Sequence, residues 1–129
     1  MPEQYLYEYA LIRVVPRVER EEFINVGVVL YCAKKKWLCA KVQIDDRRLK
    51  SLHPQVDVEL VAAHVAAISE ICKANKPGDG GPIGQLDLAS RFRWLTAMRS
   101  TIIQTSRVHP GFTLNPEETL NRLFNTMVL

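Results

Sequence analysis

The first third of the chain contains three runs in which apolar and polar residues alternate as they do in β-strands. Residues 5–15, 23–32 and 37–44 are rich in aromatic and β-branched side chains. In the third run, every second residue from Leu38 to Ile44 is apolar, which is the two-residue period of a strand with one buried face. Because the links between the runs are short and charged, we expect an antiparallel meander of three strands.

The rest of the chain follows the period of helices, with one further strand. Residues 58–74 are apolar around most of the helix circumference, which favours a helix that lies across a sheet. A shorter helix over 87–95, a strand over 101–107 and a C-terminal amphipathic helix from residue 116 follow. The side chains that we expect to cap these three helices are Asp57, Asp87 and Asn115. The predicted fold is therefore α+β, in the order β-β-β-α-α-β-α, with the helices packed on the sheet.

Length and composition fit one domain over residues 1–129. Hydrophobic residues make up 47% of the 129 positions and charged residues 24%, and 17 Lys+Arg against 14 Asp+Glu give a net charge of +3. These values are ordinary for a folded domain, and they exclude collagen-like, disordered and disulfide-scaffold proteins. A charge of +3 is too small to indicate a general polyanion binder.

The N-terminus and the cysteines indicate a cytoplasmic protein that does not bind membranes. The chain does not begin with a basic region followed by an apolar one, and its most apolar segment, residues 60–71, is too short to span a bilayer. The three cysteines include no Cys-x-x-Cys pair and suit a reducing compartment. Their spacing does not match that of metal ligands, so we expect neither a metal site nor a cofactor.

The charge is unevenly distributed, and this is the first candidate for a functional feature. Between Leu88 and Pro116 there is no Asp or Glu, and every cation is Arg, whose planar fork of donors matches carboxylate or phosphate. The candidates for contact with an anion or a partner are Arg91, Arg93, Arg99, Ser100, Thr101, Gln104, Arg107 and His109. The alternative is that these arginines form structural ion pairs or cap backbone carbonyls.

Aromatic side chains on the meander are the second candidate. If the even positions of the strands face the core, six aromatic residues share the opposite face: Tyr5, Tyr7, Tyr9, Phe23, Tyr31 and Trp37. All but Phe23 are candidates for an interface. Such a face suits docking of a protein partner or stacking of nucleic-acid bases. The alternative is that a later helix, such as the C-terminal one, covers it as core.

Motifs of known enzymes are sparse. The histidines His53, His64 and His109 form no His-Glu-x-x-His pair, and no Gly-x-Ser-x-Gly elbow occurs. The glycine-rich residues 75–84 follow no predicted strand and precede no Gly-Lys-Ser/Thr, so they read as a connecting loop rather than a phosphate-binding loop. We therefore assign no catalytic residues.

Four segments of the chain resemble the bacterial family called domain of unknown function 3037. They are YEYALIRVVPRVEREEFINVGVVLYC, GPIG, FRWLTAMRSTIIQTSRVHPG and NPEETLNRLF, in this order over nearly the whole chain. The resemblance implies a stand-alone cytoplasmic domain with no established activity, and an accessory role beside HipA-type kinase-like proteins. Where the family commonly has Ala-Pro-Arg-Ser-Thr, this chain has Ala97-Met98-Arg99-Ser100-Thr101.

Taken together, these patterns predict a non-enzymatic protein-interaction or regulatory partner module. Its partner would be another protein, such as a HipA-type kinase-like protein, or a second copy of the chain. The alternative is a module that binds a nucleotide or nucleic acid through the arginine-rich segment. An enzyme acting on small phosphorylated or acidic substrates is the third hypothesis.

Overall fold

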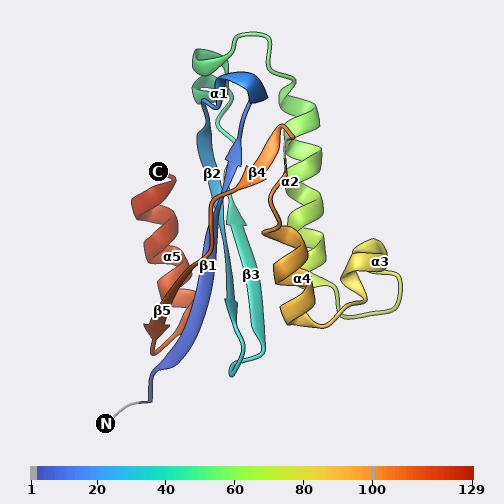
Figure 1. The fold of residues 1–129 in the computed structure, drawn as a ribbon, viewed down its shortest axis with the longest axis vertical. Coiled ribbons are helices and arrows are strands. Elements are labelled where there is room, and N and C mark those ends of the chain that lie inside the picture. The colour runs from blue at the N-terminus through green and yellow to red at the C-terminus, as the bar shows by residue number, and fades with distance from the viewer. Residues whose placement is uncertain (1–2, 100) are drawn as a thin grey trace.

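The three predicted N-terminal strands form the centre of an open antiparallel sheet. The structure is a computed structural model that describes residues 3–99 and 101–129. β1 (Tyr5–Val14), β2 (Ile24–Cys32) and β3 (Trp37–Val42) pair in succession as antiparallel neighbours (Figure 1). The predicted meander and the α+β class are confirmed.

Two short strands, where one was predicted, line the other edge of β1. β4 (Ile103–Thr105) pairs with the second half of β1, and β5 (His109–Thr113) pairs with the first half. Between β4 and β5, Ser106 forms two hydrogen bonds with Leu11 of β1. Its backbone N–H donates to the Leu11 carbonyl at 2.9 Å, and its hydroxyl accepts from the Leu11 N–H at 2.8 Å. Within the described residues the sheet thus has five strands, in the order β3-β2-β1-β4 with β5 also on β1.

β5 was not predicted from the sequence because it contains a proline and a glycine. Pro110 is tolerated because β5 is an edge strand, where one missing N–H donor does not interrupt a ladder. Gly111 is required by a close approach, since a Cβ at this position would lie 2.6 Å from the ring of Tyr7. The predicted strand over 101–107 is correspondingly shortened to the three residues of β4.

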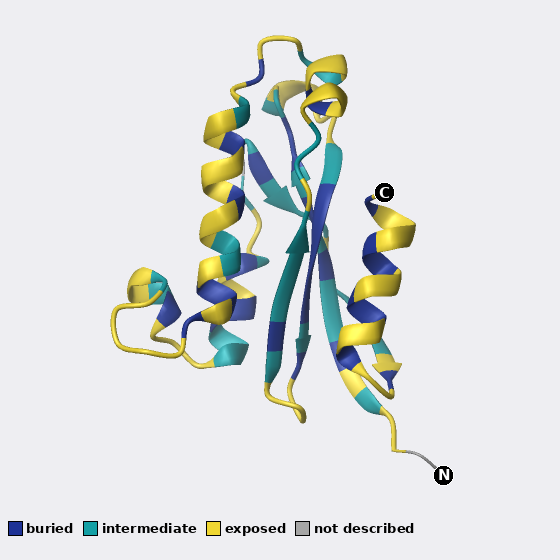
Figure 2. Ribbon diagram, turned by 180° about the vertical axis from the view of Figure 1, so that it is seen from behind, coloured by how far each residue is buried: buried dark blue, intermediate teal, exposed yellow. Residues whose placement is uncertain are grey.

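Helices cover both faces of the sheet. α2 (Val58–Lys73) and α4 (Leu88–Leu95) lie on one face, and α5 (Pro116–Met127) lies on the other (Figure 1). Each presents a buried stripe to the strands and an exposed stripe to solvent (Figure 2). We refer below to the α2 face and the α5 face of the sheet.

The predicted caps start these helices. The side chains of Asp57, Asp87 and Asn115 accept hydrogen bonds of 2.7–3.3 Å from backbone N–H groups in the first turns of α2, α4 and α5. Three shorter helical segments complete the chain. They are η1 (Val18–Arg20), α1 (Asp46–Leu52) and α3 (Gly81–Gly84), the last of which lies in the glycine-rich segment expected to be a loop.

The register between β1 and β2 decides which side chains enter which core. Tyr9 lies opposite Leu30, so the odd positions of β1 share a face with the even positions of β2. The core on the α5 face contains Tyr7, Val28, Leu30, Cys32, Leu120, Leu123, Phe124 and Val128. The larger core on the α2 face includes Ile12, Val14, Val29, Val61, Val65 and Leu95.

Candidate functional site

The aromatic face predicted for the meander is covered by α5. Tyr7 is 7% exposed and packs in the α5-face core, and Tyr5, Tyr9 and Trp37 pack partly buried against the same cluster. These side chains contribute to holding α5 on the sheet. Of the alternatives for this face, the structure shows the one in which the C-terminal helix covers it.

Tyr31 does not belong to that face, and its predicted placement is wrong. It lies opposite Glu8, an even position of β1, so its ring points to the α2 face. There it stacks on Phe92 of α4, with ring centroids 5.6 Å apart. The error arose because the sequence analysis placed the even positions of both strands on the same face.

Arg91 is a structural residue, in line with the capping alternative for the arginine-rich segment. Its side chain is 9% exposed, and Nε donates to the carbonyl of Leu86 at 2.7 Å. Nη1 donates to the carbonyls of Ala74 at 2.8 Å and Ile71 at 3.4 Å. Arg91 therefore caps the C-terminal end of α2, where the Ile71 carbonyl also accepts from the Ala74 N–H.

The remaining candidates of the arginine-rich segment are dispersed. Arg93 is exposed on α4, and Arg107 is exposed between β4 and β5. His109 lies opposite Tyr9, with ring centroids 5.3 Å apart, about 13 Å along β1 from the level of Gln104. Ser100 lies outside the described residues. Arg99, Thr101 and Gln104 remain together around β4.

Arg13 is paired with Gln104 across β1 and β4, beside a β-bulge in β2. The pairing of β1 with β2 shifts between Ile12 and Arg13, so that Val26 is an extra residue on β2. Beyond the bulge Arg13 lies between Asn25 on β2 and Gln104 on β4. Its guanidinium carbon lies 3.9 Å from the centroid of the Phe23 ring, a cation–π contact that orients the side chain.

Arg99 is held in place at the end of α4. Its guanidinium donates to the carbonyls of Leu95, at 3.0 Å, and Trp94. Its central carbon also lies 4.4 Å from the centroid of the Trp94 ring. These contacts occupy Nη1 and Nη2 once each, so further N–H groups of the five on a guanidinium are available to a ligand.

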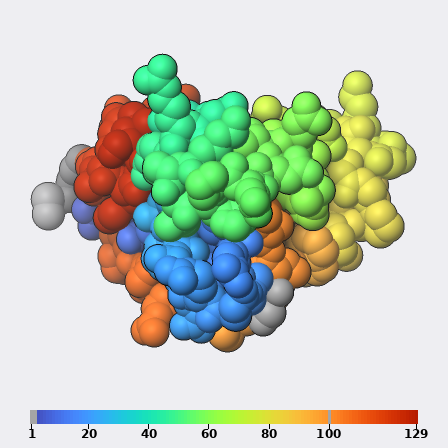
Figure 3. Space-filling model, turned by 90° about the horizontal axis from the view of Figure 1, so that it is seen from above, coloured from blue at the N-terminus to red at the C-terminus, as the bar shows by residue number. Residues whose placement is uncertain are grey.

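Arg13 and Arg99 line the same hollow on the α5-face side of β4, which we call the Arg13 hollow. Its volume is about 370 Å³, and it is open to solvent. The residues that line it are Arg13, Val15, Val18, Glu21, Phe23, Met98, Arg99 and Gln104. From above, the blue surface of the β1–η1 segment lies against the orange surface of the β4 region (Figure 3).

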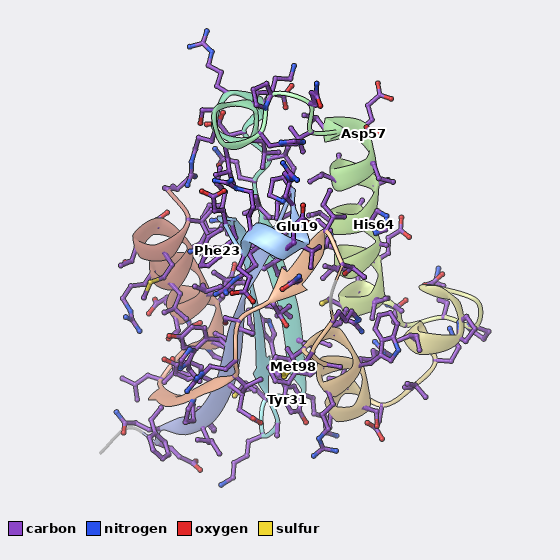
Figure 4. The ribbon with its side chains drawn as sticks, turned by 45° about the horizontal axis from the view of Figure 1, so that its top comes forward. Glu19, Phe23, Tyr31, Asp57, His64 and Met98 are labelled. Atoms are coloured by element: carbon purple, nitrogen blue, oxygen red, sulfur yellow. The ribbon has the colours of Figure 1, made fainter. Side chains whose placement is uncertain are left out.

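A second, apolar depression adjoins it, which we call the Trp94 groove. It has a volume of 250 Å³ and lies among α2, α4 and β4. The residues that line it are His64, Ala67, Ile68, Ile71, Trp94, Leu95, Arg99, Thr101 and Ile103. Figure 4 shows His64 on α2 and Met98 beyond the end of α4. Arg99 lines both depressions, so they form one continuous surface around the β4 edge.

The charges on this surface are unpaired within the described residues. The salt bridges there are Arg17–Glu19, Arg20–Glu22 and Lys34–Glu3. Arg13 and Arg99 take part in none of them. Burial lowers the pKa of the Arg13 guanidinium below its usual value, and its Nε is buried without a hydrogen-bond partner. Within the described residues, neither guanidinium is therefore in an ion pair, although Glu21 also lines the hollow.

The comparisons with known proteins identify the family. A family model described as "Protein of unknown function (DUF3037)" matches residues 9–128. The chain belongs to the DUF3037 family. A search of curated proteins and a search of solved structures found no match. In the described part of this DUF3037 chain, no helix is both long and apolar enough to cross a membrane.

Parts of the site could not be predicted from the sequence of this DUF3037 domain, because only folding brings its distant segments together. Arg13, on β1, was not a candidate, and Phe23, just before β2, was predicted on the aromatic face but not beside Arg99, which is far along the chain. Met98 and Trp94 were treated as ordinary helix and turn residues, yet Met98 is fully exposed and Trp94 is 43% exposed. The sequence contained one signal for an exposed Trp94. Phe92 and Leu95 fill the buried stripe of the short helix α4, so the large side chain of Trp94 has to lie outside that stripe.

Cysteine chemistry plays no part in this site, and the structure predicts inert thiols. Burial raises the pKa of the Cys72 thiol to about 12, and burial also raises that of Cys39. The folded state therefore binds the Cys72 proton more tightly than the unfolded state does. The contribution of this thiol to the free energy of unfolding is fully present below pH 9 and is lost as the pH rises from about 9 to 12.

We expect iodoacetamide at pH 8 to label Cys72 at least about tenfold more slowly in the folded protein than in guanidinium chloride, because the thiolate is the reactive form. Peptide mass spectrometry at several times measures each cysteine separately, and the unfolded sample is the control. Equal rates in the two states would contradict the burial of this thiol.

Proposed function

We propose that this DUF3037 domain is a non-enzymatic protein-interaction module that docks a partner protein over Met98, the Arg13 hollow and the Trp94 groove. The observation that carries the proposal is the full exposure of Met98, which lines the Arg13 hollow next to Arg99, the residue shared by both depressions. A methionine side chain left wholly in water gains hydrophobic free energy when a partner covers it.

The composition of this surface supports a protein partner. Phe23 is 44% exposed and Trp94 is 43% exposed. The guanidinium of Arg13 lies over the ring of Phe23, and that of Arg99 lies over the ring of Trp94. Aromatic residues, methionine and arginine are the residues enriched at the centres of protein interfaces. The arginine contacts also restrict both rings before binding, which lowers the entropy lost on association.

The alternative of nucleic-acid binding has less support on this molecule. Binding to a phosphate backbone needs several cations along one path, whereas Arg91 is buried in the fold and Arg107 lines neither depression. The partner is therefore a protein in this proposal. A HipA-type kinase-like protein and a second copy of the chain are the two to be examined first.

Site-specific photo-crosslinking tests the docking surface. We would replace Met98 with p-benzoylphenylalanine in the native host, irradiate the cells and identify adducts by mass spectrometry. The matched control places the same crosslinker at Leu60, which is 44% exposed on α2 and lines neither depression.

The expected result is an adduct of one defined mass from position 98 and not from position 60. Adding Arg99→Gln should lower its yield roughly tenfold, as expected when a central interface arginine is removed. An adduct of twice the chain mass would identify a second copy as the partner. Equal adducts from both positions, or none from position 98, would overturn the proposal.

A further inference from the structure

Arg13 lines the Arg13 hollow, and Asn25 is its paired neighbour on β2. Nε of Arg13 and Oδ1 of Asn25 are both buried without a hydrogen-bond partner. Asn25 uses its amide Nδ2 on the Met127 carbonyl, at 3.3 Å, which places the C-terminal end of α5 beside the hollow. Because Nε is enclosed by the fold, a ligand in the hollow would meet the Arg13 guanidinium through its Nη groups.

The second arginine is positioned before any ligand arrives. Arg99 is fixed by two carbonyls and by the Trp94 ring, as described above. Gln104 adds a side-chain amide whose Nε2 donates to the carbonyl of Thr101 at 2.8 Å. The hollow thus offers two guanidinium groups on its wall, and guanidinium forks match the two oxygens of a carboxylate.

The balance of charge in the hollow favours a ligand with one negative charge. Glu21, on the rim, is the acidic residue of the lining and is exposed. It has a left-handed backbone conformation (φ 56°) at the end of η1. Two arginines against one glutamate leave a single net positive charge, which matches a carboxylate better than a phosphate dianion.

The Trp94 groove determines what accompanies that carboxylate. Its walls are mainly aliphatic and aromatic carbon from Ile68, Leu95 and Trp94, and it meets the hollow at Arg99. A ligand that fills both depressions therefore carries a large apolar side chain next to its acidic group. It also follows the β4 edge from the α5 face to the α2 face of the sheet.

We propose that Arg13 and Arg99 bind the carboxylate of a glutamate or aspartate in an extended segment of the partner protein, while the Trp94 groove takes a neighbouring apolar side chain of that segment. This inference rests on the proposed function and names the chemistry of the partner. A phosphorylated partner and an RNA are the competing occupants, and the test separates them.

The test is a titration of the uniformly ¹⁵N-labelled full chain followed by NMR. The probe is the peptide acetyl-Ser-Gly-Glu-Leu-Phe-Gly-amide, and its matched control has glutamine in place of glutamate. We expect saturable shifts of the side-chain Nε–H signals of Arg13 and Arg99 and of the Trp94 indole N–H. The glutamine peptide should bind roughly tenfold more weakly, because a charge-assisted pair is replaced by a neutral hydrogen bond.

Three variants connect the binding to these residues. Arg13→Gln should weaken binding of the glutamate peptide roughly tenfold. Glu21→Gln should strengthen it by about two- to fivefold, since it removes a like charge from an exposed rim position and leaves the fold intact. Arg93→Gln is the control, because Arg93 is exposed on α4 and lines neither depression, and it should leave the affinity unchanged.

The remaining outcomes separate the two proposals. If the glutamate peptide leaves Arg13 and Arg99 unshifted while position 98 still crosslinks to a protein, the carboxylate site is wrong and the docking surface stands. If inorganic phosphate or a single-stranded RNA shifts these signals at lower concentration than the peptide does, the occupant is not a carboxylate and the inference is overturned. Peptide binding without any adduct at position 98 would refute the proposed docking function and retain the carboxylate site.

Discussion

Replacing Arg91 with methionine should lower the free energy of unfolding by about 3 kcal/mol. The substitution removes the donors to the carbonyls of Leu86, Ala74 and Ile71. Two of these carbonyls belong to the C-terminal end of α2, and the one of Ile71 would keep only the Ala74 N–H at 3.4 Å as a donor. Each buried acceptor left without a partner costs roughly 1–3 kcal/mol, and the apolar stem of methionine recovers part of the loss.

Urea unfolding followed by tryptophan fluorescence measures this change. The matched control is Arg93→Met, on the same helix but exposed, which should alter the free energy of unfolding by less than about 0.5 kcal/mol. The folded Arg91→Met protein should still bind the glutamate peptide. A variant with unchanged stability that no longer binds the peptide would mean that Arg91 contacts the ligand rather than α2.

Replacing Gly27 with alanine should destabilise the protein by about 2–3 kcal/mol. A Cβ at this position would lie 2.7 Å from Cγ1 of Val42 and 2.8 Å from the backbone oxygen of Lys41. The oxygen belongs to the neighbouring strand β3, whose pairing opposite Gly27 would have to shift. Overpacking of this kind in a close-packed sheet typically costs 1–3 kcal/mol.

Two further variants show where the cost of Gly27→Ala comes from. Combining it with Val42→Ala removes the contact with Cγ1 but not the contact with the Lys41 oxygen, so the double variant should have an interaction energy that offsets part of the loss. Gly111→Ala meets only the outer ring atoms of Tyr7, which can turn aside, and should cost about 1 kcal/mol. Equal losses at positions 27 and 111 would contradict the role of the backbone contact.

Local patterns in the sequence were sufficient to predict most of the elements. Strand alternation predicted β1, β2 and β3 to within two residues at each end, and Asp57, Asp87 and Asn115 cap the predicted helices. These features depend on interactions within a few residues, which the sequence lists directly. β5 was missed because the tolerance of Pro110 depends on its place at a sheet edge, which is a property of the whole sheet.

The faces of the sheet could not be predicted from alternation alone. Alternation groups the residues of one strand, but the register with the next strand decides which groups meet. Here Tyr9 pairs with Leu30, so Tyr31 turns to Phe92 and the remaining aromatic residues turn to α5. A shift of one residue would have produced the face that the sequence analysis expected.

The arginine-rich segment without Asp or Glu was visible in the sequence. Which of its arginines are structural and which are free to bind a ligand was not. The absence of Asp and Glu between residues 88 and 116 indicated positive charge in this segment, and within the described residues Arg99 takes part in no salt bridge. Whether an arginine serves the fold or a ligand depends on what surrounds its guanidinium. Arg91 lies against helix-end carbonyls, whereas Arg13 comes from β1 and lines the hollow. The sequence alone therefore establishes the elements, their caps and the place of the charge, because these are local. The assignment of each side chain to core, cap or open surface depends on strand register and on contacts between distant segments, which exist only in the folded chain.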